Sequence, residues 1–333
     1  MKKLFAILLV LVLVLSMFAG CGDAPTQGEE DEAITIGVTN STLKESVYVY
    51  MRDAAEAYLN EEGAELVWQS SENDPTAQLN QIENFIAQGV KCVTLESVRS
   101  ETAAELVNLL HDAGIPVINL EAAISGVACD LRIGADNYEI GVMQVEKLVE
   151  EWGTEKPANV VILSGTLGDE SAESLTQGEL ETLAKYPNFN VIVQQYHNGW
   201  DRQLSMNTME NALAQHENDI QIVIGNNDTL MHGGLKAAEN AGVAEDMLFF
   251  GGDFDLDTAE MLLGGKDNVF VVDRNSILQG QRIAEASLIL ARGEEPEYDV
   301  VMESGTPFWI TPLRMVDSTN VSEFAAEKYP ELI

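Results

Sequence analysis

The histidines of this chain are widely spread and match no catalytic or metal-binding spacing. Its four histidines lie far apart, at His111, His197, His216 and His232. A zinc site or a metalloprotease would instead place its ligands at short, fixed spacings. The chain also contains no H-E-x-x-H, G-x-S-x-G or phosphate-loop motif. We therefore expect a protein that is not an enzyme and that carries no cofactor.

One acidic segment has the spacing that begins a calcium loop. Asp253, Asp255 and Asp257 form a D-x-D-x-D pattern. A calcium loop also needs glycine at its sixth position and glutamate at its twelfth, and these positions hold Thr258 and Gly264. We therefore predict no metal site here.

The stretch from residue 73 to 96 contains one helix and one strand, and this plan recurs along the chain. Asp74 can cap the helix, Pro75 suits its first turn, and Gly89 can end it. Apolar residues between them recur at spacings of three and four. Apart from Lys91 at its entry, the run 90–95 is apolar and β-rich without alternation, which is typical of a strand covered by helices on both faces. The stretch predicts a parallel sheet.

The same alternation predicts two similar α/β lobes. In the first lobe we expect strands at 34–38, 66–69, 92–95, 116–120 and 131–133, and helices at 43–60, 74–88 and 100–113. In the second we expect strands at 159–163, 191–195, 220–224, 247–250 and 269–272, and helices at 138–152, 172–186, 202–215, 229–241 and 258–263. Ligands of parallel sheets lie beyond the carboxyl ends of the strands, so the loops there are the place to seek function.

The sequence DPTAQLNQIENFIAQGV, which starts at Asp74, resembles the "DPxxQxxxIxxxIxxGV" helix of type I periplasmic binding proteins. The resemblance is to sugar-binding proteins of ABC importers related to ribose-binding protein, and it runs from Ile34 to about Asn320. It implies two doubly wound parallel-sheet lobes joined by a hinge of three crossing segments. It assigns 33–136 and 275–304 to the N-terminal lobe, 137–274 and 305–318 to the C-terminal lobe, and 319–333 to a tail.

The resemblance implies ligand contacts in the first lobe at four positions. Ser41 aligns with a ligand-contacting serine, and Glu45 stands where the family has a sugar-binding asparagine. Tyr48 occupies one place of an aromatic pair, although it could serve only to pack the first turn of its helix. Glu121 follows the fourth strand, where ribose-type proteins have Asp-Arg, so an arginine of the family is absent.

Four more ligand contacts are implied in the second lobe and at the hinge. Trp200 aligns with an aromatic residue that lies against the sugar ring, and its alternative role is packing at a helix start. Asn227 is expected to bind hydroxyls while Asp228 caps the next helix. Asp253 matches an aspartate that binds two vicinal hydroxyls. Arg274 aligns with a hinge glutamine, and it could instead be a surface arginine. A second family arginine is absent, with Leu175 nearest to its position.

The N-terminus predicts export and lipid anchoring. Lys2 and Lys3 precede an apolar run that is shorter than the roughly 20 residues of a spanning helix, so we assign 1–20 to a signal peptide. Phe18, Ala19 and Gly20 before Cys21 resemble a bacterial lipobox, which implies that Cys21 is lipidated and holds the protein to the outer face of the cytoplasmic membrane. An ordinary secreted protein is the alternative. Residues 21–32 then form a polar linker.

The net charge argues against a nucleic-acid-binding protein, and the cysteines are few. The 333 residues contain 55 acidic and 18 basic side chains, a net charge of −37, so nucleic acid is not an expected partner. The fold also occurs in sugar-responsive repressors, but this chain has an export signal where they need a DNA-binding headpiece. Cys92 and Cys129 lie in apolar runs and are expected to be buried without a disulfide, although an exported protein could form one.

These observations predict the solute-binding lipoprotein of an ABC importer. The expected ligand is a sugar or sugar-like polyol, the partner is an ABC permease, and the protein is expected to be a monomer. The alternative is a sensor subunit that presents its ligand to a membrane signalling receptor. Because Glu45, Glu121 and Asp253 outnumber Arg274 among the implied contacts, we expect a neutral or cationic ligand such as a hexose, a cyclic polyol or an amino sugar.

Overall fold

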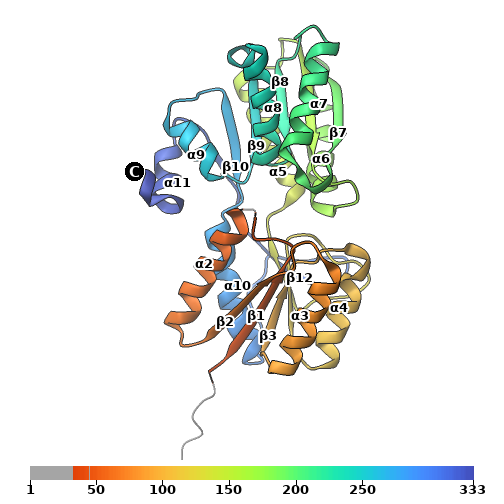
Figure 1. The fold of residues 1–333 in the computed structure, drawn as a ribbon, viewed down its shortest axis with the longest axis vertical. Helices are drawn as coiled ribbons and strands as arrows, with labels where there is room; N and C mark the ends of the chain where they lie inside the picture. Colours follow the sequence, from red (N-terminus) through yellow and green to blue (C-terminus); the bar gives the residue numbers. More distant parts are fainter. Residues whose placement is uncertain (1–32, 45) are drawn as a thin grey trace, which may run out of the picture. The chain divides into compact units, whose positions relative to one another are not determined.

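The computed structural model describes residues 33–44 and 46–333, apart from the side chain of Ser46, and its first sheet has seven strands. Their order is β11-β12-β5-β4-β3-β1-β2, and all neighbours are parallel except β11 and β12. The strands are β1 (Thr35–Asn40), β2 (Glu65–Ser70), β3 (Cys92–Leu95), β4 (Val117–Leu120), β5 (Leu131–Gly134), β11 (Val300–Val301) and β12 (Pro307–Ile310). Two apolar clusters cover this sheet, one with α2 (Ser46–Glu61) and α10 (Ser276–Ala291), the other with α3 (Pro75–Gln88) and α4 (Ser100–Asp112) (Figure 1).

The second sheet has six strands in the order β13-β10-β9-β8-β6-β7, and only β13 is antiparallel to its neighbour. They are β6 (Ala158–Ser164), β7 (Phe189–Tyr196), β8 (Ile222–Gly225), β9 (Leu248–Gly252), β10 (Val269–Asp273) and β13 (Arg314–Val316). Its helices are α5 (Asn137–Trp152), α6 (Glu170–Leu183), α7 (Arg202–Gln215), α8 (Asp228–Ala241), α9 (Leu256–Leu263) and α11 (Val321–Lys328). Val161 and Leu163 pack on the side of α7 and α8, whereas Val160 and Ile162 pack on the side of α5. The alternation shows why a two-sided strand is apolar throughout.

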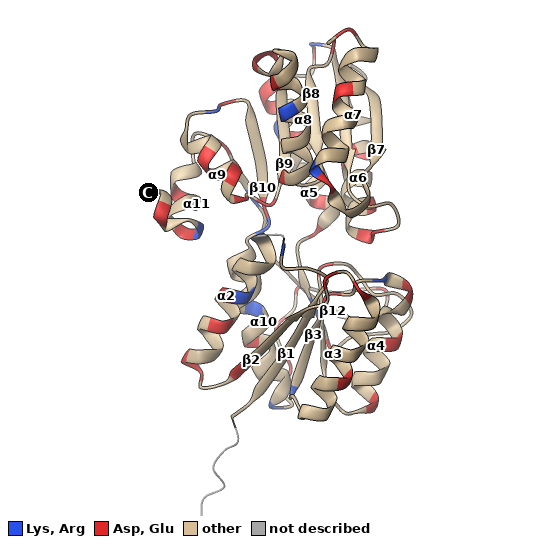
Figure 2. Ribbon diagram, in the orientation of Figure 1, with Lys and Arg blue, Asp and Glu red and all other residues tan. Residues whose placement is uncertain are grey.

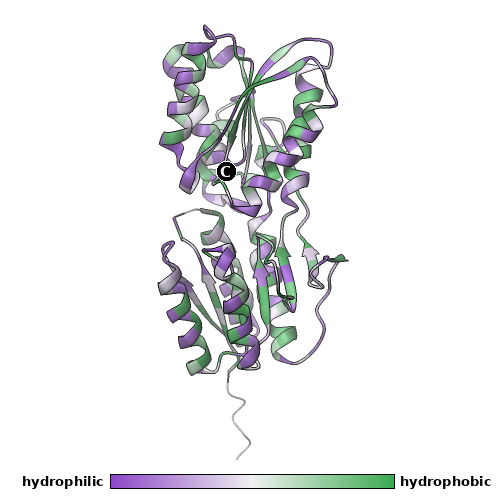
Figure 3. Cartoon of the chain, turned by 90° about the vertical axis from the view of Figure 1, so that its right-hand side faces the viewer, coloured by the Kyte–Doolittle hydropathy of each residue, from purple (hydrophilic) through white to green (hydrophobic). Residues whose placement is uncertain are grey.

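Local signals explain the helix ends. The Asp74 side chain accepts a hydrogen bond from the Thr76 backbone N–H, and Pro75 occupies the first turn of α3. Gly89 then adopts φ 70° and ends the helix. The expected two-lobed α/β class is confirmed. Figure 3 shows the resulting pattern, with hydrophobic strands at the centre of each lobe and hydrophilic residues on the outer helix faces.

The chain crosses between the sheets three times, and from Ile34 to Ile333 it forms one compact unit. The crossings lie between β5 and α5, between β10 and α10, and between β12 and β13. The position of the third crossing corrects our assignment of the whole segment 305–318 to the second lobe. Phe308 and Ile310 pair in parallel with Arg132 and Gly134 of β5, so β12 completes the first sheet.

The segment 319–333 is not a loose tail. It contains α11 and a short 3₁₀ helix, Pro330–Leu332. Ala325 and Tyr329 are fully buried in the apolar cluster of the second lobe. The apolar spacing that buries α11 is only two turns long, which is too short to stand out in the sequence.

Both cysteines of the described chain are free and buried, as expected. Cys92 lies in β3 and Cys129 precedes β5, and β4 separates these strands. Burial raises the pKa of each thiol to about 12. Within residues 33–44 and 46–333, no helix combines the length and the apolar character needed to cross a membrane. Acidic residues are distributed over the helices of both lobes (Figure 2).

Candidate binding site

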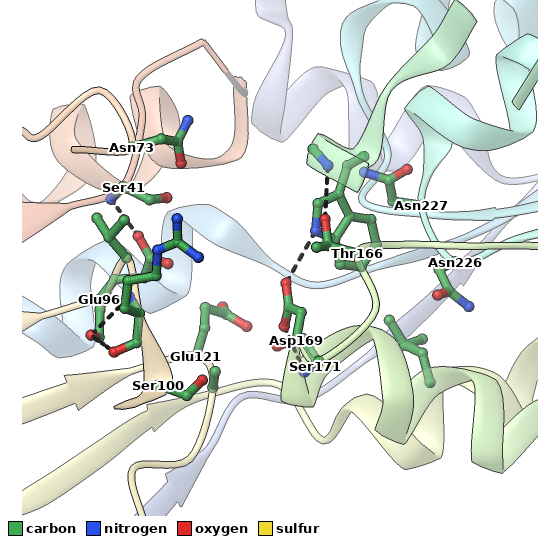
Figure 4. A pocket seen from close by; sticks show the side chains of 18 of the residues that line it. Ser41, Asn73, Glu96, Ser100, Glu121, Thr166, Asp169, Ser171, Asn226 and Asn227 are labelled. Atoms are coloured by element: carbon green, nitrogen blue, oxygen red, sulfur yellow. Dashed lines mark hydrogen bonds between the residues drawn. The ribbon is translucent and has the colours of Figure 1, made fainter. Parts of the chain in front are cut away.

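Loops from both lobes line a cavity of about 510 Å³. They follow the carboxyl ends of strands in each sheet, which is where ligands of parallel α/β folds lie. The volume suits a small molecule. Figure 4 shows Ser41, Glu96 and Glu121 of the first lobe and Asp169 and Asn227 of the second around the same space.

Seven of the eight residues proposed from the sequence line this one cavity: Ser41, Tyr48, Glu121, Trp200, Asn227, Asp253 and Arg274. Glu45 lies outside the described residues. Tyr48 lines the cavity and also packs against the apolar cluster of the first lobe, so its two possible roles coexist. The Ser41 backbone N–H donates to the Glu96 carboxylate, which orders the loop after β1.

Arg274 lies at a crossing and reaches both lobes. Its Nη1 is 3.6 Å from Glu121 Oε2, and its Nε is 3.9 Å from Asp253 Oδ1. Its Nη2 donates to Asn137 Oδ1 at the start of α5. The side chain is only 14% exposed, so the alternative of a surface arginine is wrong. Arg274 therefore balances two carboxylates that would otherwise face the same cavity uncompensated.

Glu121 is held in an unusual backbone conformation. Its φ is 63°, and the residue is 5% exposed. Arg132 Nε donates to the Glu121 carbonyl oxygen at 2.7 Å, and the Arg132 guanidinium lies 4.3 Å from the centre of the Phe308 ring. Neither carboxylate oxygen of Glu121 has a hydrogen-bond partner among the described residues, although Arg274 lies within ion-pair distance. Glu121 thus offers buried acceptors to a ligand that carries donors.

Trp200 is fixed against the second lobe. Its indole Nε1 donates to Asp169 Oδ2 at 3.1 Å, and the ring lies directly over Gly165. A Cβ at residue 165 would come within 2.5 Å of that ring, so only glycine leaves room for it. Trp200 lines the cavity and also touches apolar clusters of its lobe, which fits both of its proposed roles.

The histidine in the same loop is structural. His197 is 1% exposed. Its Nδ1 donates to the Ser164 carbonyl oxygen and its Nε2 accepts from the Thr208 hydroxyl, each at 2.9 Å. Burial lowers the pKa of this imidazole, which favours the neutral ring that these bonds require. His197 therefore holds the loop that carries Trp200.

The expected division of roles between Asn227 and Asp228 is reversed at the helix cap. Asn227 Oδ1 accepts from the Leu230 N–H and caps α8, while Asp228 is the first helical residue. Asp228 Oδ2 instead accepts from the Asp255 N–H and the Thr258 hydroxyl, and Asp228 is 1% exposed. Asn227 still lines the cavity, but one of its polar atoms is engaged in the cap.

Asn226, which also lines the cavity, is held by a buried acid. Its Nδ2 donates to Glu179 Oε1 at 2.9 Å, and its Oδ1 accepts from the Gly165 N–H at 2.8 Å. Glu179 is fully buried, and burial raises the pKa of its carboxyl to about 8, against the opposing effect of the Asn226 hydrogen bond. The neutral acid thereby supports the loop after β6.

The three aspartates with calcium-like spacing do not converge. Asp253 faces Arg274, Asp255 caps α9, and Asp257 pairs with Arg202 at 3.2 Å. Asp255 does join Asp228 and His232, whose ligand atoms lie within 4.8 Å of one another.

Polar contacts join the members of the cluster around His232, although His232 Nδ1 and Asp228 Oδ1 have no hydrogen-bond partner among the described residues. His232 Nε2 is 3.2 Å from Asp255 Oδ1 and 3.0 Å from the Thr258 hydroxyl. Burial opposes the charged imidazole, but the hydrogen bond to Asp255 and the charges of both carboxylates outweigh it and raise the pKa of His232. We interpret this cluster as a buried network that joins α8 to α9.

Sequence reasoning missed several residues of the cavity wall: Asn73, Glu96, Arg99, Asp169, Asn198 and Asn226. Most lie within a few residues of the carboxyl end of a predicted strand. A search of every such loop for polar side chains would have found them, whereas matching to known ligand positions did not.

Comparison with known proteins agrees with this geometry. Residues 36–295 match the family model described as a periplasmic binding protein domain. The D-xylose-binding periplasmic protein of Escherichia coli is 26% identical over 246 residues, which cover 73% of each chain. The ribose import binding protein of Haemophilus influenzae is 27% identical and covers 91% of this chain and 98% of its own.

A solved structure extends the similarity to three dimensions. The ABC transporter solute binding protein of Bacillus halodurans, with bound myo-inositol, superimposes with a TM-score of 0.79 and 27% identity. The match covers 90% of this chain and 99% of that one. With a family match over most of its length and the two-lobed fold described above, this chain belongs to the type I periplasmic binding protein family.

Proposed function

We propose that this protein binds a sugar or a sugar-like polyol in the cavity between its lobes and delivers it to an ABC permease. The observation that carries the proposal is the cavity itself, in which an indole, several carboxylates and two arginines from separate loops line one small-molecule space. An aromatic face suits the C–H surface of a sugar ring, and carboxylates accept strongly from hydroxyls. Two relatives of this chain are named for xylose and ribose, and the similar structure from Bacillus halodurans holds myo-inositol.

Each ligand contact has a physical role in this proposal. Trp200 stacks on one face of the ring, and Asp253 accepts hydrogen bonds from vicinal hydroxyls. Glu121 offers its buried carboxylate oxygens from the other lobe. Arg274 offsets the negative charge of Glu121 and Asp253, so that a neutral ligand can lie beside both. Because contacts come from both lobes, binding would favour a closed arrangement about the crossings.

The proposal includes a lipid anchor at Cys21, followed by the linker 21–32, with the folded lobes outside the cytoplasmic membrane. This part rests on the sequence of the leader, which lies outside the described residues. Transport is favoured over the sensor alternative, because the three similar proteins described above are named for sugar binding, ribose import or an ABC transporter.

A ligand panel tests the function directly. We expect thermal-shift screening and then isothermal titration of the mature protein to find saturable binding for at least one of myo-inositol, D-xylose, D-ribose and D-glucose. The bound sugar should be recovered unchanged, because no catalytic step is proposed. Amino acids and sugar phosphates serve as negative controls. Binding only among these controls, or turnover of a bound sugar, would contradict the proposal.

A further inference from the structure

Lys328, at the last position of α11, is a lysine with a buried ammonium group. Its side chain is 3% exposed. Nζ donates to the carbonyl oxygens of Asp253 at 2.9 Å and Phe254 at 2.8 Å. A lysine is seldom buried unless its charge is compensated, so these partners require a reason.

Aromatic rings and one carboxylate complete the surroundings of this ammonium. Nζ lies 5.6 Å from the ring centre of Tyr50, 5.5 Å from that of Phe254 and 5.7 Å from that of Tyr329. Asp273 Oδ1 is 3.5 Å away. Such contacts stabilise a desolvated cation. Tyr50 belongs to α2 of the first lobe and meets Tyr329 edge to face at 5.3 Å, so the first lobe contributes one wall of this cage.

The two carbonyls that Lys328 binds belong to a strained segment. Asp253 has φ 153° and Phe254 has φ 56°, both in a range that side-chain-bearing residues rarely adopt. The Tyr329 hydroxyl also donates to the Phe254 carbonyl oxygen, at 2.7 Å. Without these donors the segment could relax towards ordinary angles, and the Asp253 side chain would turn away from the cavity.

The same ammonium reaches the other side of the site. Asp273, which is fully buried, lies next to Arg274 in the chain and also accepts from Arg314. Lys328 therefore joins the backbone that carries Asp253 to the residue that precedes Arg274. α11 lies outside the residues that match the family model, 36–295, so Lys328 itself is not covered by the family match, whereas Asp253 and Asp273 are.

We propose that Lys328 is a positioning residue for the binding site: its caged ammonium fixes the strained Asp253–Phe254 backbone and so aims the Asp253 carboxylate at the ligand. The proposal rests on the proposed sugar-binding function. It differs from a general role in folding, because the effect of Lys328 must pass through Asp253.

A double-mutant cycle separates these two roles. Lys328→Met and Asp253→Asn are made singly and together, and affinities for myo-inositol, D-xylose and D-ribose are measured by titration. We expect Lys328→Met to weaken the best of these sugars about ten-fold or more in the native background, as loss of a charge-assisted interaction does. In the Asp253→Asn background, Lys328→Met should weaken the affinity for the same sugar by less than about two-fold. Equal losses in both backgrounds would overturn the proposal.

Two further variants guard against simple loss of fold. Tyr329→Phe removes only the hydroxyl that donates to Phe254, and should give a smaller loss that also disappears with Asp253→Asn. Lys236→Met changes an exposed lysine of α8 in the same lobe and should leave the affinities unchanged. An effect of Lys236→Met equal to that of Lys328→Met would count against a specific role.

Hydrogen exchange of the ligand-free protein tests whether Lys328 fixes the Asp253–Phe254 backbone, and this test does not require that any sugar binds. The Asp253 N–H donates to the Val272 carbonyl oxygen and the Asp255 N–H to the Asp228 carboxylate, so both amides are protected. Lys328→Met should speed exchange in residues 252–256 relative to the rest of the second lobe. Unchanged exchange there would refute the positioning role, whereas faster exchange together with no binding of any sugar would refute only the proposed function.

Discussion

Arg274 Nη1 lies 3.6 Å from Glu121 Oε2, and this ion pair joins the crossing after β10 to the loop after β4. The pair is largely shielded from water, with side-chain exposures of 14% and 6%. Asp253 approaches the same guanidinium from the second lobe. In the proposed binding mode the ligand contacts these three charged groups, so the charge of the ligand should affect its affinity.

Ligand charge is the first prediction. We expect D-glucose and D-glucosamine to bind more tightly than D-glucuronate, because carboxylates outnumber arginines in the cavity wall. At an effective dielectric near 20, each excess negative charge at cavity distances repels an anion by a few kcal/mol. Isothermal titration with these three sugars, or with the matched neutral, amino and acidic forms of the best sugar found, measures the order. Arg274→Gln should widen the preference for the amino sugar. A preference for the acidic sugar would show that the cavity residues are wrongly assigned.

Ring stacking and hydroxyl binding are the second prediction. Trp200→Ala and Asp253→Ala should each weaken sugar binding by about 1.5 to 3 kcal/mol, since one removes an aromatic face and the other a charge-assisted acceptor. Titration calorimetry measures both. Tyr298→Ala, which removes an aromatic ring that is 52% exposed and does not line the cavity, is the control. Native affinity in both cavity variants would remove these residues from the site.

The role of the Trp200 ring position can be tested by a variant that keeps Trp200 itself. Gly165→Ala would place a methyl group within 2.5 Å of the Trp200 ring, so the ring must move into the cavity or out of its stacking position. We expect a loss of affinity comparable to that of Trp200→Ala, and little further loss when the two are combined. Additive losses in the double variant would mean that Gly165 acts through another contact.

Glu179 makes stability depend on pH. Its folded-state pKa of about 8 lies above the ordinary value near 4.5, so the stability it contributes is fully present below about pH 4.5 and is lost as pH rises through about 8. Glu179→Gln should therefore reduce the fall in unfolding free energy over this range, by an amount on the order of a few kcal/mol. Urea unfolding at several pH values measures it. Glu210→Gln, at an exposed position of α7, should leave the slope unchanged.

Lipid anchoring is tested by Cys21→Ser. The hydroxyl cannot accept the thioether-linked lipid, so we expect the variant in the soluble exported fraction while the native protein stays with membranes. Cell fractionation with an antibody against the folded lobes detects both. Membrane association of the variant at the native level would contradict the lipobox interpretation.

Local sequence determined the elements and the edge at which the site forms. Asp74 and Gly89 set the ends of α3 through bonds to residues at most four positions away, and two-sided burial made the strands apolar throughout. Ligands of parallel α/β folds lie at the carboxyl ends of the strands, and the seven residues that resemblance pointed to line one cavity at those ends.

Only the tertiary structure decided which groups meet. Arg274 contacts Asn137 across 137 positions of sequence, and Lys328 contacts Asp253 across 75. Strand pairing decides that β12 belongs to the first sheet, and no short segment encodes that pairing. Burial likewise decides that Asn227, and not Asp228, caps α8. The physical reason is that caps and apolar periodicity act within one or two turns, whereas ion pairs and buried donors acquire their partners only when the chain has closed.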